Sequence, residues 1–109
     1  MIEELRQCFL FANMPEPQFQ RIVRHAVTRQ LQTGETLFEQ GDTADRFYLL
    51  TSGQIKLFRL SPAGNEKVVS IITPGLTFGE ALMFLDRPHY PVGAQALQAS
   101  TLISLDSLD

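Results

Sequence analysis

The stretch Phe78-Gly79-Glu80-Ala81-Leu82 holds the residue types whose spacing best suits ligand binding. A glycine at the start of a short helix exposes free backbone N–H groups at the positive end of the helix dipole, which predicts an anion site. A Gly-Glu pair at a turn is also common in β domains, where Phe78 and Phe84 fill the core. These residues alone leave both interpretations open.

The sequence offers little for other kinds of chemistry. His25 and His89 are the only histidines, and neither has a neighbour at metal-ligand spacing. Cys8 is the only cysteine, which excludes an internal disulfide and a multi-cysteine zinc or iron–sulfur site. Neither a nucleophile elbow nor a P-loop is present. We therefore expect that the chain is not an enzyme. A cupin-like metal enzyme, which needs several converging histidines, is a disfavoured alternative.

Length and composition restrict the chain to one compact domain. It has 109 residues, of which 44% are hydrophobic and 19% are charged, with a net charge of -3. An acidic balance argues against direct binding of a nucleic-acid backbone. Apolar runs fall short of the roughly 20 residues that span a bilayer, and the charged N-terminus is not a secretory signal. We expect a cytoplasmic domain without a membrane partner, in which Asp42, Asp45 and Arg46 form a solvated charged turn.

Hydrophobic periodicity predicts helices first and strands afterwards. Ile2, Leu5 and Phe9 form the apolar stripe of one short helix, and a second helix is expected over residues 16–26. From Val27 onward, glycines recur between short apolar runs, which predicts an all-β sandwich or roll. The expected strands include residues 47–50, 54–60, 66–72, 95–99 and 101–105, and one or two helical turns are expected over residues 79–85.

The segments GETLFEQGD (34–42) and FYLLTSGQIKL (47–57) resemble the cyclic-nucleotide-binding domain of the CRP/FNR family of bacterial transcription regulators. The step Gly79-Glu80 is similar to the start of that family's phosphate-binding cassette. The resemblance implies a mainly β fold, a double-stranded β-helix or jelly roll, with N-terminal helices and a short cassette helix. Residues 1–109 then form the effector-sensing domain. A dimerisation helix and a helix-turn-helix DNA-binding domain are expected beyond residue 109, in a full-length homodimer.

The resemblance also marks a departure from the members that bind cyclic AMP. Those members place an Arg downstream of the cassette Glu, followed by Ser or Thr and then Ala, where this chain has Tyr90, Pro91 and Val92. Tyrosine supplies no cation, and Pro91 has neither a hydroxyl nor an N–H. Leu82 stands where many binders keep a small residue. Because a buried phosphate without a counter-charge costs several kcal/mol, we expect no cyclic nucleotide to bind. Arg87 is the candidate substitute partner, and a genuine cyclic-nucleotide-binding module is the alternative.

Residues 78–96 are further similar to the nitric-oxide-responsive denitrification regulators of the Dnr/Nnr type, through the pattern Phe78-x-Glu80-Ala81-x-Met83-Phe84-x-Asp86-x-Pro88-x-Tyr90 and the following Ala94-Gln95-Ala96. This resemblance implies a gas effector sensed through haem, and the apolar residues gained near Tyr90 suit a porphyrin face. Haem iron needs a His, Cys, Met or Tyr ligand. The candidates are His25, His89, Cys8 and Tyr90.

Each haem-ligand candidate also has an ordinary structural role. The two histidines suit exposed positions, Cys8 suits a small core site, and Tyr90 suits a core position with its hydroxyl at the surface. From these residues alone, we expect the effector to be a small molecule or a gas. A scaffold that binds no ligand is the remaining alternative.

Overall fold

The computed structural model describes residues 5, 7, 12–79 and 89–106 of the chain. Within these residues, no helix is long and apolar enough to cross a membrane. The elements are helix α2 (Glu16–Arg24) and strands β1 (Val27–Leu31), β2 (Thr36–Phe38), β3 (Arg46–Ser52), β4 (Ile55–Leu60), β5 (Glu66–Ile72), β6 (Thr77–Phe78), β7 (Gly93–Ala96) and β8 (Ser100–Asp106).

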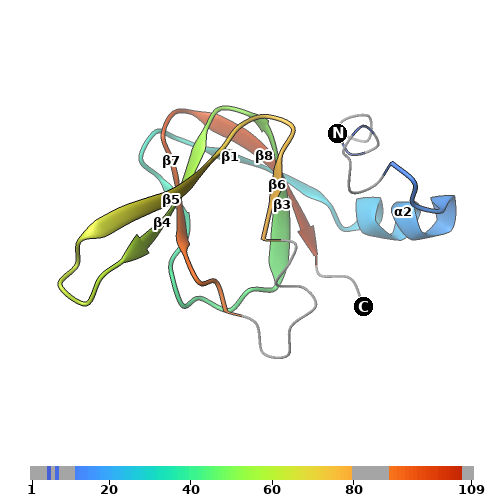
Figure 1. The fold of residues 1–109 in the computed structure, drawn as a ribbon. Coiled ribbons are helices and arrows are strands. Elements are labelled where there is room, and N and C mark those ends of the chain that lie inside the picture. The colour runs from blue at the N-terminus through green and yellow to red at the C-terminus, as the bar shows by residue number, and fades with distance from the viewer. Residues whose placement is uncertain (1–4, 6, 8–11, 80–88, 107–109) are drawn as a thin grey trace.

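The strands form two antiparallel sheets, in the orders β1-β8-β3-β6 and β2-β7-β4-β5. Several neighbours in each sheet are distant in the sequence, as β8 shows by pairing with both β1 and β3. Helix α2 lies at one end of the molecule, and the β4–β5 hairpin projects at the other (Figure 1). This arrangement confirms the predicted mainly β jelly roll with a helix before it.

Helix α2 forms because its apolar residues repeat at helical spacing next to a Pro-containing start. Pro15 stands at the N-cap, and Pro17 occupies the first turn, where a missing N–H leaves no hydrogen bond unmade. Phe19 and Ile22 are buried, whereas Arg21 lies in the last turn, where a cation complements the helix dipole. The helix therefore presents one apolar face to the outside of the β1-β8-β3-β6 sheet.

Strand β3 separates two hydrophobic clusters because alternate side chains of a strand point to opposite faces. Phe47 and Leu49 belong to the outer cluster, together with Phe19 and Ile22 of the helix. Tyr48 and Leu50 belong to the inner cluster, which fills the space between the two sheets. Strand β3 is thus buried on both faces, and its first residue lies at the end of the roll nearest the candidate site.

One strand prediction is wrong in its bounds. A strand was expected over residues 95–99, but β7 runs over Gly93–Ala96 and a bend follows. Gly93 pairs with Phe58 of β4, and a Cβ on Gly93 would lie only 2.7 Å from Cζ of the Phe58 ring. Glycine therefore starts the strand because it leaves room for that ring. The other strands contain the expected residues, apart from one or two at their ends.

Two predicted helices fall largely outside the described residues. In the first, Leu5 is helical and buried, whereas Ile2 and Phe9 are not described. The predicted cassette helix over residues 79–85 is described only at Gly79.

Candidate effector site

Two chain segments that are far apart in the sequence meet at the candidate site. Strand β6 ends at Phe78, and Gly79 follows with a φ of 86°. The second segment reaches β7 through Tyr90, whose backbone N–H donates to the Asp42 carbonyl (2.9 Å) and whose carbonyl accepts from the Gly41 N–H (2.8 Å). These two bonds fix residue 90 against the 41–42 turn.

Four aromatic rings pack together where a ligand pocket was expected. The Tyr90 ring stacks on Phe38 with the ring centroids 3.7 Å apart. The Tyr48 and Phe78 rings stack at 5.3 Å, and Phe38 lies 6.0 Å from Tyr48. All four side chains belong to the inner hydrophobic cluster. We call Phe38, Tyr48, Phe78 and Tyr90 the aromatic cluster, and it lies at this end of the roll.

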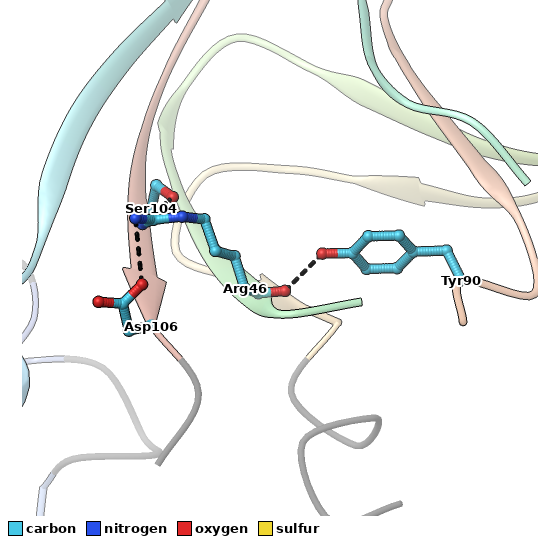
Figure 2. Close-up of polar contacts among 4 residues, drawn as sticks. All are labelled: Arg46, Tyr90, Ser104 and Asp106. Atoms are coloured by element: carbon cyan, nitrogen blue, oxygen red, sulfur yellow. Dashed lines mark hydrogen bonds and ion pairs between the residues drawn. The ribbon is translucent and has the colours of Figure 1, made fainter. Parts of the chain in front are cut away.

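The Tyr90 hydroxyl is buried rather than exposed. Tyr90 is only 4% exposed, and its hydroxyl donates to the Arg46 carbonyl at 2.6 Å (Figure 2). The expectation that a Tyr90 in the core would keep its hydroxyl at the surface is therefore wrong, because the Arg46 carbonyl supplies a partner inside the protein. Burial raises the pKa of Tyr90 and that of Tyr48. Both phenols stay neutral near pH 7.

Arg46 was expected in a solvated turn, but it is the first residue of β3. Its Nη1 donates to Oγ of Ser104 at 2.9 Å, and its Nη2 lies 3.1 Å from Oδ1 of Asp106. In Figure 2 the guanidinium extends to the side of Arg46 that faces away from the Tyr90 hydroxyl. Asp42 and Asp45 are exposed, as expected, and the Asp42 carboxylate accepts from the Glu39 N–H at 2.9 Å. The positive charge of Arg46 is thus already paired by β8.

The predicted pocket residues have different positions. Phe78 and Tyr90 are buried, Val92 packs against the inner cluster, and Pro91 is exposed. A Cβ on Gly79 would lie 3.5 Å from the Arg46 carbonyl oxygen, so this glycine also borders the site. The five described members of the predicted pocket therefore belong to the two segments that meet here. Glu80, Ala81, Leu82 and Arg87 lie outside the described residues.

The described haem-ligand candidates do not gather at one place. His25 is the exposed C-cap of α2, whereas exposed His89 forms a β-bridge with Thr43 and has its Nδ1 3.2 Å from the Gly41 carbonyl. Tyr90 is buried with its hydroxyl engaged, and Cys8 is outside the described residues. Within the described ranges, no cluster of His, Cys, Asp and Glu could hold a metal ion. The described candidates thus form no shared ligand set, and haem binding stays a prediction.

Sequence reasoning did not identify Phe38 and Tyr48 as site residues. Their only signal was the alternation of side chains along β2 and β3, which does not reveal that the two strands face each other. It also missed an open depression of about 520 Å³ near the end of β1, lined by Gln30, Leu31, Gln32, Glu35, Ser52, Ala99, Ser100 and Thr101. Its lining is mostly polar and carries no cluster of reactive groups.

Known proteins are similar to this chain in both sequence and fold. The chain is 38% identical over 77 residues to the transcriptional activator protein Anr of Pseudomonas protegens, covering 71% of this chain and 31% of that protein. It is 39% identical over 69 residues to a CRP-like cAMP-activated global transcriptional regulator of Mycobacterium tuberculosis, covering 59% of this chain and 31% of the relative. The chain thus spans well under half of these relatives.

The fold is similar to that of the sensor domain of the transcriptional regulator DNR from Pseudomonas aeruginosa. The TM-score is 0.89 at 35% identity, and the match covers 96% of this chain and 70% of that structure. Residues 28–109 match the family model described as the cyclic nucleotide-binding domain. The predicted resemblance to CRP/FNR-family regulators is confirmed: this chain belongs to the cyclic nucleotide-binding domain family.

Proposed function

We propose that this chain is the effector-sensing domain of a CRP/FNR-type transcription regulator and that its effector is not a cyclic nucleotide. The observation that carries the proposal is the position of Tyr90. This residue matches the Arg that pairs with the phosphate in members that bind cyclic AMP, and its ring is stacked on Phe38 inside the roll. A neutral phenol there replaces the expected cation.

The surroundings of Tyr90 offer no substitute charge among the described residues. Its hydroxyl hydrogen already bonds to the Arg46 carbonyl, and the Arg46 guanidinium is paired with Asp106. A cyclic phosphate placed here would lose its hydration and gain no counter-ion, which disfavours binding by several kcal/mol. The aromatic cluster supports an apolar effector, or one that displaces Tyr90.

Isothermal titration with cyclic AMP and cyclic GMP tests the proposal. We expect no binding in the micromolar range for the natural chain or for Tyr90→Phe. The variant Tyr90→Arg/Pro91→Ser restores a cation and a hydroxyl, so we expect it to gain binding of a cyclic nucleotide. Micromolar binding by the natural chain would overturn the exclusion of cyclic nucleotides.

The remaining parts of the regulator are proposed from its relatives. A cytoplasmic homodimer, which reads DNA through a separate domain, fits the transcription-regulator names of the relatives that the chain matches. The effector must bind the two states of that dimer with different affinity, because equal affinity shifts no equilibrium. A mobility-shift assay of the full-length regulator tests DNA binding, and sedimentation analysis tests the dimer.

Nitric oxide sensed through haem is the second candidate. Its support is the Dnr/Nnr-like pattern in residues 78–96, together with the likeness in fold to the DNR sensor domain. Bound haem would supply an iron that takes up nitric oxide. Haem titration of the purified full-length protein, followed by nitric oxide, should give a stoichiometric Soret shift. If no Soret shift appears, the haem proposal is rejected, whereas the proposal of an effector-sensing domain is unaffected. His25→Ala and His89→Ala show whether either histidine contributes.

A further inference from the structure

We propose that Arg46 couples the Tyr90 hydroxyl to the Asp106 carboxylate, so that a change at the effector site reaches the C-terminal end of β8. The meaning of this coupling rests on the proposed function, which places the effector site at Tyr90. The coupling itself is a property of the folded chain. It can therefore be measured without any effector.

The first link is the hydrogen bond from the Tyr90 hydroxyl to the Arg46 carbonyl, at 2.6 Å. Tyr90 is buried, so water does not readily replace a partner lost here. The Tyr90 backbone is held by the 41–42 turn, and its ring is held by Phe38. The hydroxyl therefore reaches the start of β3 from a fixed position.

The second link joins β3 to β8. Arg46 and Asp106 are directly opposite each other in the strand register, and their side chains form an ion pair at 3.1 Å. The same guanidinium donates to Oγ of Ser104, a residue that is 2% exposed. Because the ion pair is partly exposed, its Coulomb energy alone is small. Its importance is geometric, since two bonds from one planar group fix how the end of β8 lies on β3.

Arg46 and Asp106 lie at strand ends, where local order is lowest. Arg46 begins β3 and Asp106 ends β8, whereas the neighbouring pair Phe47 and Leu105 is held in the outer cluster. Strand ends open at a lower free energy than buried interiors do, so one bond there changes the open population measurably. When Tyr90 moves, the Arg46 carbonyl loses its partner and the Arg46–Asp106 pair loosens.

Amide hydrogen exchange by NMR on the 109-residue chain tests this coupling. The variant Tyr90→Phe keeps the stacked ring and removes the hydroxyl. We expect exchange at residues 46–48 and 104–106 to accelerate severalfold, without an equal change in β4. Thr51→Val is the matched control, because the Thr51 hydroxyl donates to the Thr101 carbonyl at the other end of the same strand pair. This control should leave residues 104–106 unchanged.

A double-mutant cycle separates coupling from general destabilisation. In an Asp106→Asn background, which lacks the ion pair, Tyr90→Phe should accelerate exchange at residues 46–48 and 104–106 much less than it does in the natural chain. Equal effects in the two backgrounds would overturn the coupling, as would acceleration no larger than in Thr51→Val.

The reciprocal measurement keeps the proposal testable if Tyr90→Phe folds poorly. By linkage, Asp106→Asn should shift the Tyr90 ring resonances, whereas Lys56→Gln, which breaks a different cross-strand ion pair, should not. Unmoved Tyr90 resonances in Asp106→Asn would also overturn the coupling. Failure in these experiments leaves the nucleotide and haem titrations unaffected, so the two proposals fail separately.

Discussion

The Phe38 and Tyr90 rings lie face to face, with their centroids 3.7 Å apart and their planes inclined by 10°. Phe38 comes from β2, and Tyr90 comes from the segment just before β7, the strand that pairs with β2. The stack therefore joins two neighbouring chain segments inside the roll. Tyr90 is consequently a core residue as well as a site residue. An effector that enters this end of the roll must either displace the ring or bind beside it.

Replacing Phe38 should destabilise the fold strongly. Phe38→Ala removes the surface on which Tyr90 stacks and leaves a cavity among three other rings, so the free energy of unfolding should fall by about 3 to 5 kcal/mol. Urea unfolding followed by circular dichroism measures this loss. Leu60→Ala is the control, because Leu60 is exposed on β4 and its loss should change stability by less than about 0.5 kcal/mol. A smaller loss for Phe38 than for Leu60 would contradict the packing described above.

Stability should fall in alkaline solution because of the two buried tyrosines. Burial raises the pKa of both Tyr48 and Tyr90 above the ordinary value of 10.0. The stabilisation that neutral phenols provide is therefore fully present below pH 10, and it is lost as the pH rises through the folded-state values. Urea unfolding between about pH 8 and about pH 11 should show the decline beginning near the ordinary tyrosine pKa.

Two observations check the origin of this alkaline decline. Tyr90→Phe should flatten it, because one titrating group is gone. Tyr48 and Tyr90 are the only tyrosines, and the chain has no tryptophan, so the phenolate absorbance reports on these two residues alone. It should appear together with unfolding. Phenolate formation in a chain that stays folded near pH 10 would contradict the raised pKa values.

Gly53 should tolerate substitution far less than Gly64 does. Both have a positive φ, 95° and 86°, which costs a side chain about 1 to 2 kcal/mol. A Cβ on Gly53 would also lie 2.1 Å from Oγ of Ser100 and 2.6 Å from its Cα, whereas nothing lies within 4 Å at Gly64. Gly53→Ala should therefore lose about 3 kcal/mol or more in urea unfolding. Equal losses in the two variants would show that the backbone at residue 100 moves easily.

One strand could be predicted from the alternation of polar and apolar residues along it. The segment over residues 54–60 alternates, and it forms β4 over Ile55–Leu60. The small residues that begin β7 show no such alternation. Position 93 needs a glycine because a Cβ there would collide with the Phe58 ring. Alternation of polarity reports burial, whereas a close approach between two strands depends on a pairing that the linear sequence does not contain.

The sequence indicated some residues that meet at the candidate site, but it did not indicate how they pack. Motif spacing led to Gly79 and Tyr90, which the structure places around the Arg46 carbonyl. The stack of Tyr90 on Phe38 and the pairing of Arg46 with Asp106 join residues that are far apart in the sequence. Such contacts depend on strand order, so neither residue types nor local spacing reveals them. The predictions of pocket residues, haem ligands and effector remain to be tested.

Strand β8 pairs with β1 on one side and with β3 on the other. This strand is also synthesised after all the other described strands, because it comes last of them in the sequence. Until β8 is present, β1 and β3 lack the strand that joins them, although every strand of the β2-β7-β4-β5 sheet precedes β8 in the sequence. Closure of the roll must therefore await β8, so a chain cut before Ser100 should not form the native pair of sheets.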